Sequence, residues 1–181
     1  RTLASIDAQV GVAGAVRILV ADNDETPSAK PLVDGGGGRW PRTYIHAPAR
    51  NISIARNALL DASTADFIAW IDDDEIADPT WLCSLLAAIG DHDAAFGPVR
   101  AVYPSNAPDW ILKSDLHSTS AVVTRQGVVT GYTSNALVRR AAAGPERFLE
   151  ALGRSGGEDT EFFTRLYGQG RRLSLIHISE P

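Results

Sequence analysis

The stretch FIAWIDDDE, residues 67–75, decides how this sequence is interpreted because two opposite patterns meet in it. Residues 67–71 form a continuous run of bulky apolar side chains, which predicts a buried β-strand. The run ends on four consecutive acids, residues 72–75. Adjacent like charges repel one another, so this cluster at the end of a buried strand points to a function that uses it.

The acids have the spacing of a cation site. On an extended backbone Asp72 and Asp74 point to the same side, about 6–7 Å apart, and Asp73 points away. Hard oxygen ligands suit Mg²⁺ or Mn²⁺, and substrate phosphates usually complete such sites. A cation would also offset the repulsion that otherwise raises the pKa values of the acids. The alternative is a solvated turn that caps the next helix, but Asp78 before Pro79 already predicts that cap.

The surrounding patterns predict an α/β fold. Strand and helix patterns alternate through the first half of the chain, which favours a mostly parallel sheet with helices on its faces. Ligands of such sheets bind beyond the carboxyl ends of the strands, where Asp22 and residues 72–75 are expected. Residues 104–130 predict irregular structure. The expected strands are residues 15–21, 43–46, 67–71, 94–103 and 134–138, and the expected helices are residues 1–9, 51–63, 158–167 and one starting at Asp78-Pro79.

Composition narrows the function classes. The 181 residues suffice for one domain, and a hydrophobic content of 44% allows a core of ordinary size. A net charge of −5 without blocks of Lys or Arg argues against a nucleic-acid partner. The single Cys83 excludes an internal disulfide. No stretch has the ~18 apolar residues of a membrane span, so we expect a cytoplasmic protein with no transmembrane segment in this chain.

The C-terminal residues 173–181 read LSLIHISEP and resemble the in-frame translation of a transposase sequencing adapter. We therefore expect residues 1–172 to be the native domain and residues 173–181 to be non-native. The alternative is that SLIHI continues the fold as an ordinary strand.

Five segments, in order, resemble the motifs of the family 2 glycosyltransferases, which have the nucleotide-sugar-binding GT-A fold. Each motif alone is weak, but their order over residues 15–172 is specific. The sequence is most similar in character to bacterial exopolysaccharide glycosyltransferases of the succinoglycan type. The matching segments are VADND (20–24), NISIARNALL (51–60), FIAWIDDDE (67–75), TSNALVRR (133–140) and GGEDTEFFTRLYGQGRR (156–172).

The resemblance implies transfer of a sugar from a nucleoside diphosphate to an acceptor hydroxyl, with inversion at the anomeric carbon and with Mn²⁺ or Mg²⁺ as cofactor. Asp74 matches the metal-binding Asp, and Asp72 would contact the ribose or share the metal. Asp73 would contact the nucleotide sugar or only bond to backbone. Asp22, with Asn23 beside it, matches the Asp that contacts the nucleotide base.

The helical segment at residues 51–60 supplies a further nucleotide contact. Arg56 matches a residue that fixes the nucleotide or its phosphates; alternatively, it is a surface Arg paired with Asp61 or Asp66. Ser53 stands where the family usually has Gly.

The acceptor side is expected at the start of the last helix. Asp159 matches the catalytic base, which takes the proton of the acceptor hydroxyl, and Glu158 would orient the acceptor or Asp159. Helix capping is the alternative, and both roles can hold together. Gly156 and Gly157 permit close approach of a substrate. Trp110 could cover an apolar sugar face, or else pack the loop against the core.

Two other function classes stay open. A metal-dependent nucleotidyltransferase would release pyrophosphate, and a non-catalytic domain would only bind a nucleotide sugar, although binding alone does not need a base at Asp159. Family habit suggests a UDP-sugar donor and a saccharide or lipid-linked saccharide acceptor. The lipid-linked case leaves open peripheral association with the inner face of the cell membrane. The resemblance also implies that the family's first strand and C-terminal region lie outside this chain.

Overall fold

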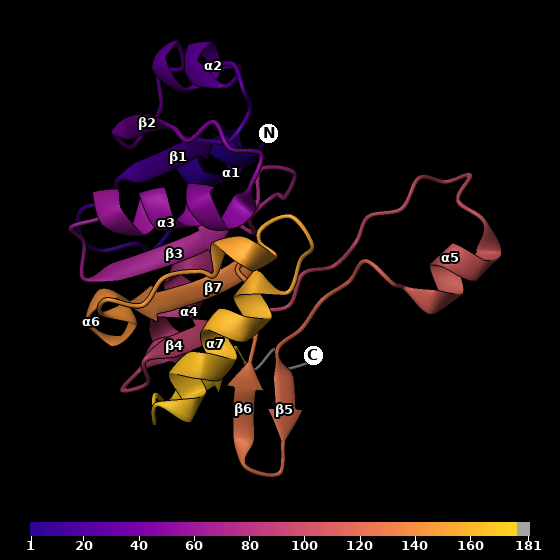
Figure 1. Cartoon of the computed structure of the whole chain (residues 1–181). Coiled ribbons are helices and arrows are strands. Elements are labelled where there is room, and N and C mark those ends of the chain that lie inside the picture. Colours follow the sequence, from indigo (N-terminus) through magenta and orange to yellow (C-terminus); the bar gives the residue numbers. More distant parts are fainter. Residues whose placement is uncertain (177–181) are drawn as a thin grey trace.

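The computed structural model describes residues 1–176, and its strands form a layer with helices on both faces (Figure 1). The strands predicted at residues 15–21, 43–46, 67–71 and 134–138 are confirmed. The strands are β1 (Ile18–Asp22), β2 (Arg42–His46), β3 (Phe67–Ile71), β4 (Ala94–Phe96), β5 (Val122–Thr124), β6 (Gly127–Thr130), β7 (Asn135–Arg139) and β8 (Leu173–Leu175).

Helices follow most of these strands, as the alternating pattern predicted. The amphipathic helices expected after Pro48 and after Gly157 are confirmed as α3 and α7. The helices are α1 (Thr2–Asp7), α2 (Lys30–Asp34), α3 (Ile52–Ala62), α4 (Trp81–Ile89), α5 (Asp109–Ser114), α6 (Arg140–Ala143), the 3₁₀ turn η1 (Glu150–Leu152) and α7 (Glu158–Gly168).

The structure differs from the mostly parallel sheet that the sequence predicted, because the strands pair in separate sheets of mixed direction. β1 pairs with β2 in parallel, and a second set of strands has the order β3-β7-β4-β8. β7 runs antiparallel to both of its neighbours, whereas β8 runs parallel to β4, so β3, β4 and β8 share one direction. This arrangement places the carboxyl end of β3 beside the amino end of β7, where the acids lie.

Alternating side chains of the central strands bury both faces of the sheet. Ala136 and Val138 of β7 pack into a core with α7, whereas Leu137 between them packs on the opposite face with α4. β4 divides in the same way, with Phe96 on the first face and Ala95 on the second. A strand covered on both faces needs apolar residues at every position, which explains the continuous apolar runs in the sequence.

Several predicted boundaries were wrong, among them the start of the strand expected at 15–21, which begins at Ile18. The strand expected at 94–103 ends at Phe96, because Pro98 has no N–H to donate and Val99 pairs only with Thr119 on the far side of a long loop. The helix expected to start at Asp78-Pro79 begins at Trp81. Asp78 instead closes the preceding turn, because its carboxylate accepts from the N–H and the hydroxyl of Thr80.

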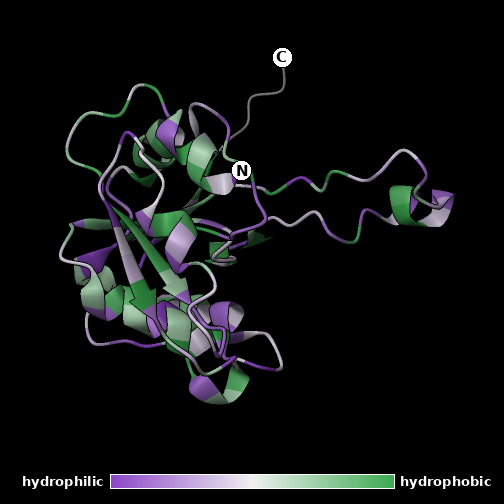
Figure 2. Cartoon of the chain, turned by 90° about the horizontal axis from the view of Figure 1, so that it is seen from above, coloured by the Kyte–Doolittle hydropathy of each residue, from purple (hydrophilic) through white to green (hydrophobic). Residues whose placement is uncertain are grey.

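The region expected to be irregular contains regular structure. β5 and β6 form an antiparallel hairpin, and α5 sits on an arm, residues 100–118, that projects away from the body (Figures 1 and 2). Figure 2 shows hydrophobic residues on α5 even though it lies far from the core. Trp110 on α5 is 65% exposed, so the alternative that it packs the loop against the core was wrong.

The tail expected to be an adapter translation lies partly outside the described residues, at 177–181. Leu173–Leu175 forms β8 against β4, and the N–H of Ile176 donates to the carbonyl of Phe96. The non-native origin of residues 173–181 stays a prediction. Among residues 1–176, no helix combines the length and apolar character needed to cross a membrane.

Candidate active site

The carboxyl end of β3 opens into a pocket of about 350 Å³. Because β7 runs antiparallel to β3, with Asn135 opposite Ile71, the residues that enter β7 lie beside the acids that leave β3. The start of α7 adds Asp159 to the same pocket. We call it the acid pocket, and it is lined by Asp72, Asp74, Glu75, Val99, His117, Thr119, Tyr132, Ser134 and Asp159.

Residues 72–75, the acid turn, are held by the N-terminal helix. The hydroxyl oxygen of Thr2 lies 2.6 Å from the carbonyl oxygens of both Asp73 and Glu75. Within the turn, the N–H of Asp72 donates to the Glu75 carboxylate at 3.2 Å. Thr2 and Asp73 are 71 positions apart, so no local sequence pattern predicts this support. The turn therefore presents its carboxylates from a backbone that is fixed at both ends.

The acid pocket resists full ionisation. Burial raises the pKa of Asp72; Arg56 opposes this effect, and the charges of Asp74 and Asp159 add to it. Burial also raises the pKa of Glu75 to about 7, against the hydrogen bond from the N–H of Asp72. These shifts mean that any added positive charge in the pocket would be stabilised.

Arg56 is a buried residue that joins three elements. It is 6% exposed, and its guanidinium donates to the Glu158 carboxylate of α7. Its Nη2 lies 3.6 Å from a carboxylate oxygen of Asp72. The alternative of a surface Arg paired with Asp61 or Asp66 was wrong, since Arg56 faces inward towards the acid pocket.

Glu158 is as deeply placed as its partner. It is 5% exposed, and its Oε2 is buried without a hydrogen-bond partner among the described residues. A carboxylate in such a position needs a compensating cation, which Arg56 supplies. Glu158 therefore ties α7 to α3, while its neighbour Asp159 faces the acid pocket.

Two glycines turn the chain into α7. Gly156 has φ +86° and Gly157 has φ +88°, a left-handed conformation that side chains with a Cβ rarely adopt. A Cβ would meet nothing within 4 Å at either position, so the backbone conformation, not crowding, requires glycine. This turn sets the direction in which Asp159 enters the helix.

Asp22 lies at the end of β1 and outside the acid pocket. It is 7% exposed, and its carboxylate accepts from the N–H of Ala29 at 2.8 Å, the Tyr44 hydroxyl at 2.9 Å and the N–H of Asp24 at 3.1 Å. Burial acts to raise the pKa of Asp22, but these hydrogen bonds outweigh it and hold the pKa below its usual value. The same contact contributes to raising the pKa of Tyr44 to about 12, after burial.

The segment that resembles the family's Gly-containing motif is packed tightly against η1. Asn51 caps α3 by accepting from the N–H of Ile54, and its amide donates to the carbonyl of Glu150. Ser53 is fully buried, and its hydroxyl donates to the carbonyl of Leu149 at 2.9 Å. Ser53 in place of the usual Gly is thus accommodated by a hydrogen bond inside the fold.

The structure groups some predicted site residues and separates others. Asp72, Asp74 and Asp159 share the acid pocket, and Arg56 with Glu158 forms the layer behind it. Asp22 and Asn23, which were predicted to contact the nucleotide, lie at the end of β1. Asp73 is exposed on the acid turn, and Trp110 lies on the projecting arm. Residues that sequence reasoning missed are Glu75, His117, Thr119, Tyr132 and Ser134.

Those missed residues differ in how visible they were. Glu75 belongs to the acid run, Ser134 lies within the TSNALVRR segment and Tyr132 directly precedes it, so local signals existed for them. His117 and Thr119 come from the loop beyond β4 and reach the pocket only because Thr119 pairs with Val99. Within residues 1–176, no group of three or more His, Cys, Asp or Glu is already arranged to hold a metal ion.

Comparisons with known sequences agree with this geometry. A family model described as Glycosyl transferase family 2 matches residues 1–144. Over 166 residues the chain is 48% identical to the succinoglycan biosynthesis protein ExoM of Rhizobium meliloti (strain 1021). The match covers 88% of this chain and 54% of ExoM, so the chain spans about half the length of that relative.

Solved structures share the fold. A crystal structure of S. aureus TarS has a TM-score of 0.74 at 17% identity, covering 98% of this chain and 32% of TarS. TarS 1-349 in complex with UDP-GlcNAc has a TM-score of 0.73 at 18% identity, covering 98% of this chain and 52% of that one. These likenesses confirm the predicted GT-A-like α/β fold. The family match, the ExoM identity and this fold together show that the chain belongs to glycosyl transferase family 2.

Proposed function

We propose that this chain is part of an inverting, metal-dependent glycosyltransferase that moves a sugar from a nucleoside-diphosphate sugar to an acceptor hydroxyl in polysaccharide synthesis. One observation supports this most directly: Asp159 lines the same pocket as Asp72 and Asp74. A carboxylate that can take a proton and carboxylates that can face a diphosphate site are the two parts that sugar transfer needs.

The reaction assigns a role to each side of the pocket. Asp159 accepts the proton of the acceptor hydroxyl while that oxygen bonds to the anomeric carbon of the donor sugar. The bond from this carbon to the diphosphate oxygen breaks, and its electron pair leaves with the nucleoside diphosphate. Because attack and departure occur on opposite faces of the sugar, the configuration at the anomeric carbon inverts.

The acid turn suits a divalent cation. Asp74 and Asp72 would hold Mn²⁺ or Mg²⁺ through hard carboxylate oxygens, and the ion would neutralise charge on the leaving diphosphate. The pocket's fit to a cation rests on its donor set, because Asp72, Asp74, Glu75 and Asp159 line it together. Burial and neighbouring acids also raise the pKa values of Asp72 and Glu75. Two carboxylates leave coordination positions for phosphate oxygens, as Mg²⁺ sites usually do.

The remaining residues position the donor. Asp22 and Asn23 would contact the base or ribose, with Asp22 held ionised by its internal hydrogen bonds. Arg56 lies 3.6 Å from Asp72 and would steady that carboxylate beside the nucleotide. Glu158 holds Arg56, and through the first turn of α7 it orients Asp159 towards the acceptor.

We further propose a UDP-sugar as donor and a saccharide, free or lipid-linked, as acceptor. The bound UDP-GlcNAc of TarS 1-349, a protein with the same fold, and the naming of ExoM for succinoglycan biosynthesis support this choice. We also propose action at the cytoplasmic side of the cell, with peripheral contact at the inner membrane face if the acceptor is lipid-linked.

Calorimetric titration of UDP, GDP and dTDP, with and without Mn²⁺, tests the proposal on the chain and on Asp74→Asn. We expect one nucleotide to bind in a Mn²⁺-dependent manner and the variant to lose that dependence. Asp66→Asn is the matched control, because Asp66 is an exposed acid at the opposite end of β3. Binding of none of the three nucleotides by the chain would contradict the proposal, and release of pyrophosphate instead of a nucleoside diphosphate would indicate nucleotidyl transfer.

A further inference from the structure

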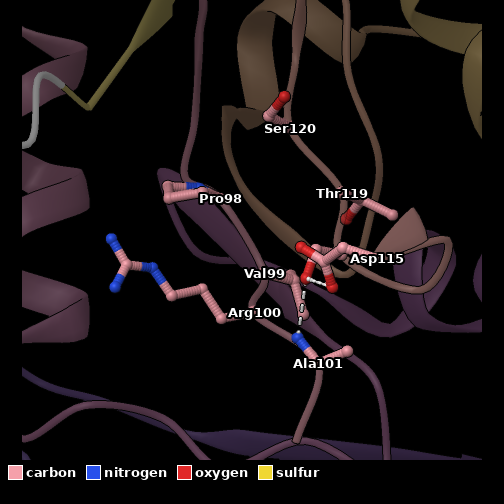
Figure 3. A pocket seen from close by; sticks show the side chains of 8 residues that line it. Pro98, Val99, Arg100, Ala101, Asp115, Thr119 and Ser120 are labelled. Atoms are coloured by element: carbon pink, nitrogen blue, oxygen red, sulfur yellow. Dashed lines mark hydrogen bonds between the residues drawn. The ribbon is translucent and has the colours of Figure 1, made fainter. Parts of the chain in front are cut away.

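We propose that a second cavity, at the base of the arm, binds a neutral sugar unit of the acceptor and directs its hydroxyl to Asp159. This inference rests on the proposed function. We call this cavity the arm pocket. Figure 3 shows it between the two chain segments that lead into and out of the arm. Its volume of about 500 Å³ falls within the ~300–1,000 Å³ of small-molecule sites.

The arm pocket adjoins the acid pocket. Val99 and Thr119 line both cavities. Their backbones exchange two hydrogen bonds, with N···O distances of 2.8 and 3.0 Å. These bonds form an isolated antiparallel bridge that closes the base of the arm. A molecule in the arm pocket would therefore lie next to the pocket that contains Asp159.

Hydrogen bonds connect the two sides of the arm pocket. The hydroxyl of Ser118 donates to Asp115 Oδ1 at 2.8 Å and accepts from the N–H of Ala101 at 2.9 Å. The Tyr103 hydroxyl donates to the same Asp115 oxygen at 3.0 Å. Asp115 adopts a left-handed φ of +45°, a conformation that Asp tolerates better than most residues. These contacts hold the two segments of the arm together beside the cavity.

Polar groups with unused hydrogen-bonding capacity remain on this wall. The guanidinium of Arg100 has no ion-pair or hydrogen-bond partner among residues 1–176, and the same is true of the side-chain hydroxyls of Thr119 and Ser120. Asp115 uses Oδ1 for both of its contacts within the described chain, which leaves Oδ2 to accept. The wall thus offers donors, acceptors and hydroxyls that can act as either.

This set matches a sugar better than an anion. Arg100 and Asp115 have opposite charges, so the wall is close to neutral, and the adjoining acid pocket would repel an anionic ligand. Sugar hydroxyls both donate and accept, which the mixed wall satisfies, and Pro98 and Ala101 offer small apolar surfaces for C–H groups. Drug-like apolar ligands would leave these polar groups unpaired at a cost.

The test titrates short oligosaccharides, prepared by partial hydrolysis of succinoglycan, into the chain in the presence of UDP and Mn²⁺. Arg100→Ala and Ser120→Ala alter the wall, and both side chains are exposed, so folding should not change. Arg125→Ala is the matched control, because Arg125 is an exposed Arg on the β5–β6 turn, outside both pockets. UDP affinity is measured separately for every variant.

We expect Arg100→Ala to weaken oligosaccharide binding about tenfold and Ser120→Ala about threefold, with Arg125→Ala unchanged and UDP affinity equal throughout. Unchanged oligosaccharide affinity in both wall variants would overturn the inference, as would UDP binding without any oligosaccharide binding. Failure of UDP itself to bind would instead count against the proposed function, so the two failures can be told apart.

Discussion

Asp22 and Asp72 occupy corresponding places in the fold, at the carboxyl ends of β1 and β3, but their surroundings move their pKa values in opposite directions. Both lose hydration on burial, which raises a carboxyl pKa. Asp22 receives three hydrogen bonds that outweigh this effect. Asp72 instead faces the charges of Asp74 and Asp159, which Arg56 opposes. The donors and acids that face each carboxylate therefore decide the direction in which its pKa moves.

This difference suits different tasks. A carboxylate that stays ionised through internal hydrogen bonds is a stable acceptor for a neutral group such as a base or ribose. A carboxylate crowded by other acids is stabilised by an incoming cation. Substitutions at Asp159, Glu158, Asp22 and Glu75 change the surroundings of one carboxylate or the other.

Asp159→Asn removes a charge that faces Asp72. Transfer should fall by about 10²–10⁴-fold because the proton acceptor is lost, while nucleotide affinity stays within about twofold. The pKa of Asp72 should fall, since the charge of Asp159 helps to raise it. Turnover assays and an NMR titration of the Asp72 carboxyl measure both effects. Parallel loss of nucleotide binding would argue against Asp159 as the base.

Glu158→Gln breaks the buried pair behind the acid pocket. Arg56 would lose its partner, so the free energy of unfolding should fall by about 3 kcal/mol. Urea unfolding measures this, with the exposed Glu150→Gln as control. Replacing both partners together, Arg56→Met with Glu158→Met, should recover most of the loss, because no charge is then left unpaired. A neutral effect of Glu158→Gln would show that Asp72 alone can balance Arg56.

Asp22→Asn tests the other side of the comparison. An amide in place of the carboxylate turns an N–H₂ group towards one of the donors, and we expect a loss of about 1–3 kcal/mol at pH 7. Because the pKa of Asp22 is lowered by folding, its stabilising contribution is present above its unfolded pKa and is lost as pH falls through the folded pKa. The variant should therefore lose less stability on acidification than the wild type.

Urea unfolding at pH 7 and near pH 3 measures that difference. Asp24→Asn, an exposed neighbour, serves as the control and should behave as the wild type. An equal acid dependence in Asp22→Asn and the wild type would mean that other carboxylates determine acid unfolding.

Glu75→Gln should have the smallest effect. Folding raises the pKa of Glu75 to about 7 from an unfolded value near ~4.3, so between these values the folded chain binds the extra proton. The stability that this proton contributes is fully present below the unfolded pKa of Glu75. It is lost as the pH rises through the folded pKa of Glu75. The variant should lose fewer degrees of Tm than the wild type between pH 5 and pH 8. Equal losses would contradict the assigned pKa.

The sequence by itself determined the α/β class, the strands at the core and the order of the motifs, because those features depend on local periodicity and on residue type. The run at residues 67–71 had to be a buried strand, and the acids after it had to lie at an edge where ligands bind. The strand at β4 was predicted, but its end at Phe96 was not, because that end depends on pairing with β7. The local hairpin β5–β6 lay in a segment expected to be irregular.

Only the tertiary structure decided which acids meet. Asp159 reaches Asp72 because antiparallel pairing of β3 with β7 and packing of α7 bring together residues 87 positions apart. The pairing of Arg56 with Glu158, the support of the acid turn by Thr2, and the exposure of Trp110 on the arm likewise follow from contacts between distant segments. Charge, burial and hydrogen bonding act through space, so local sequence can name the reacting groups but cannot set their pKa values or their neighbours.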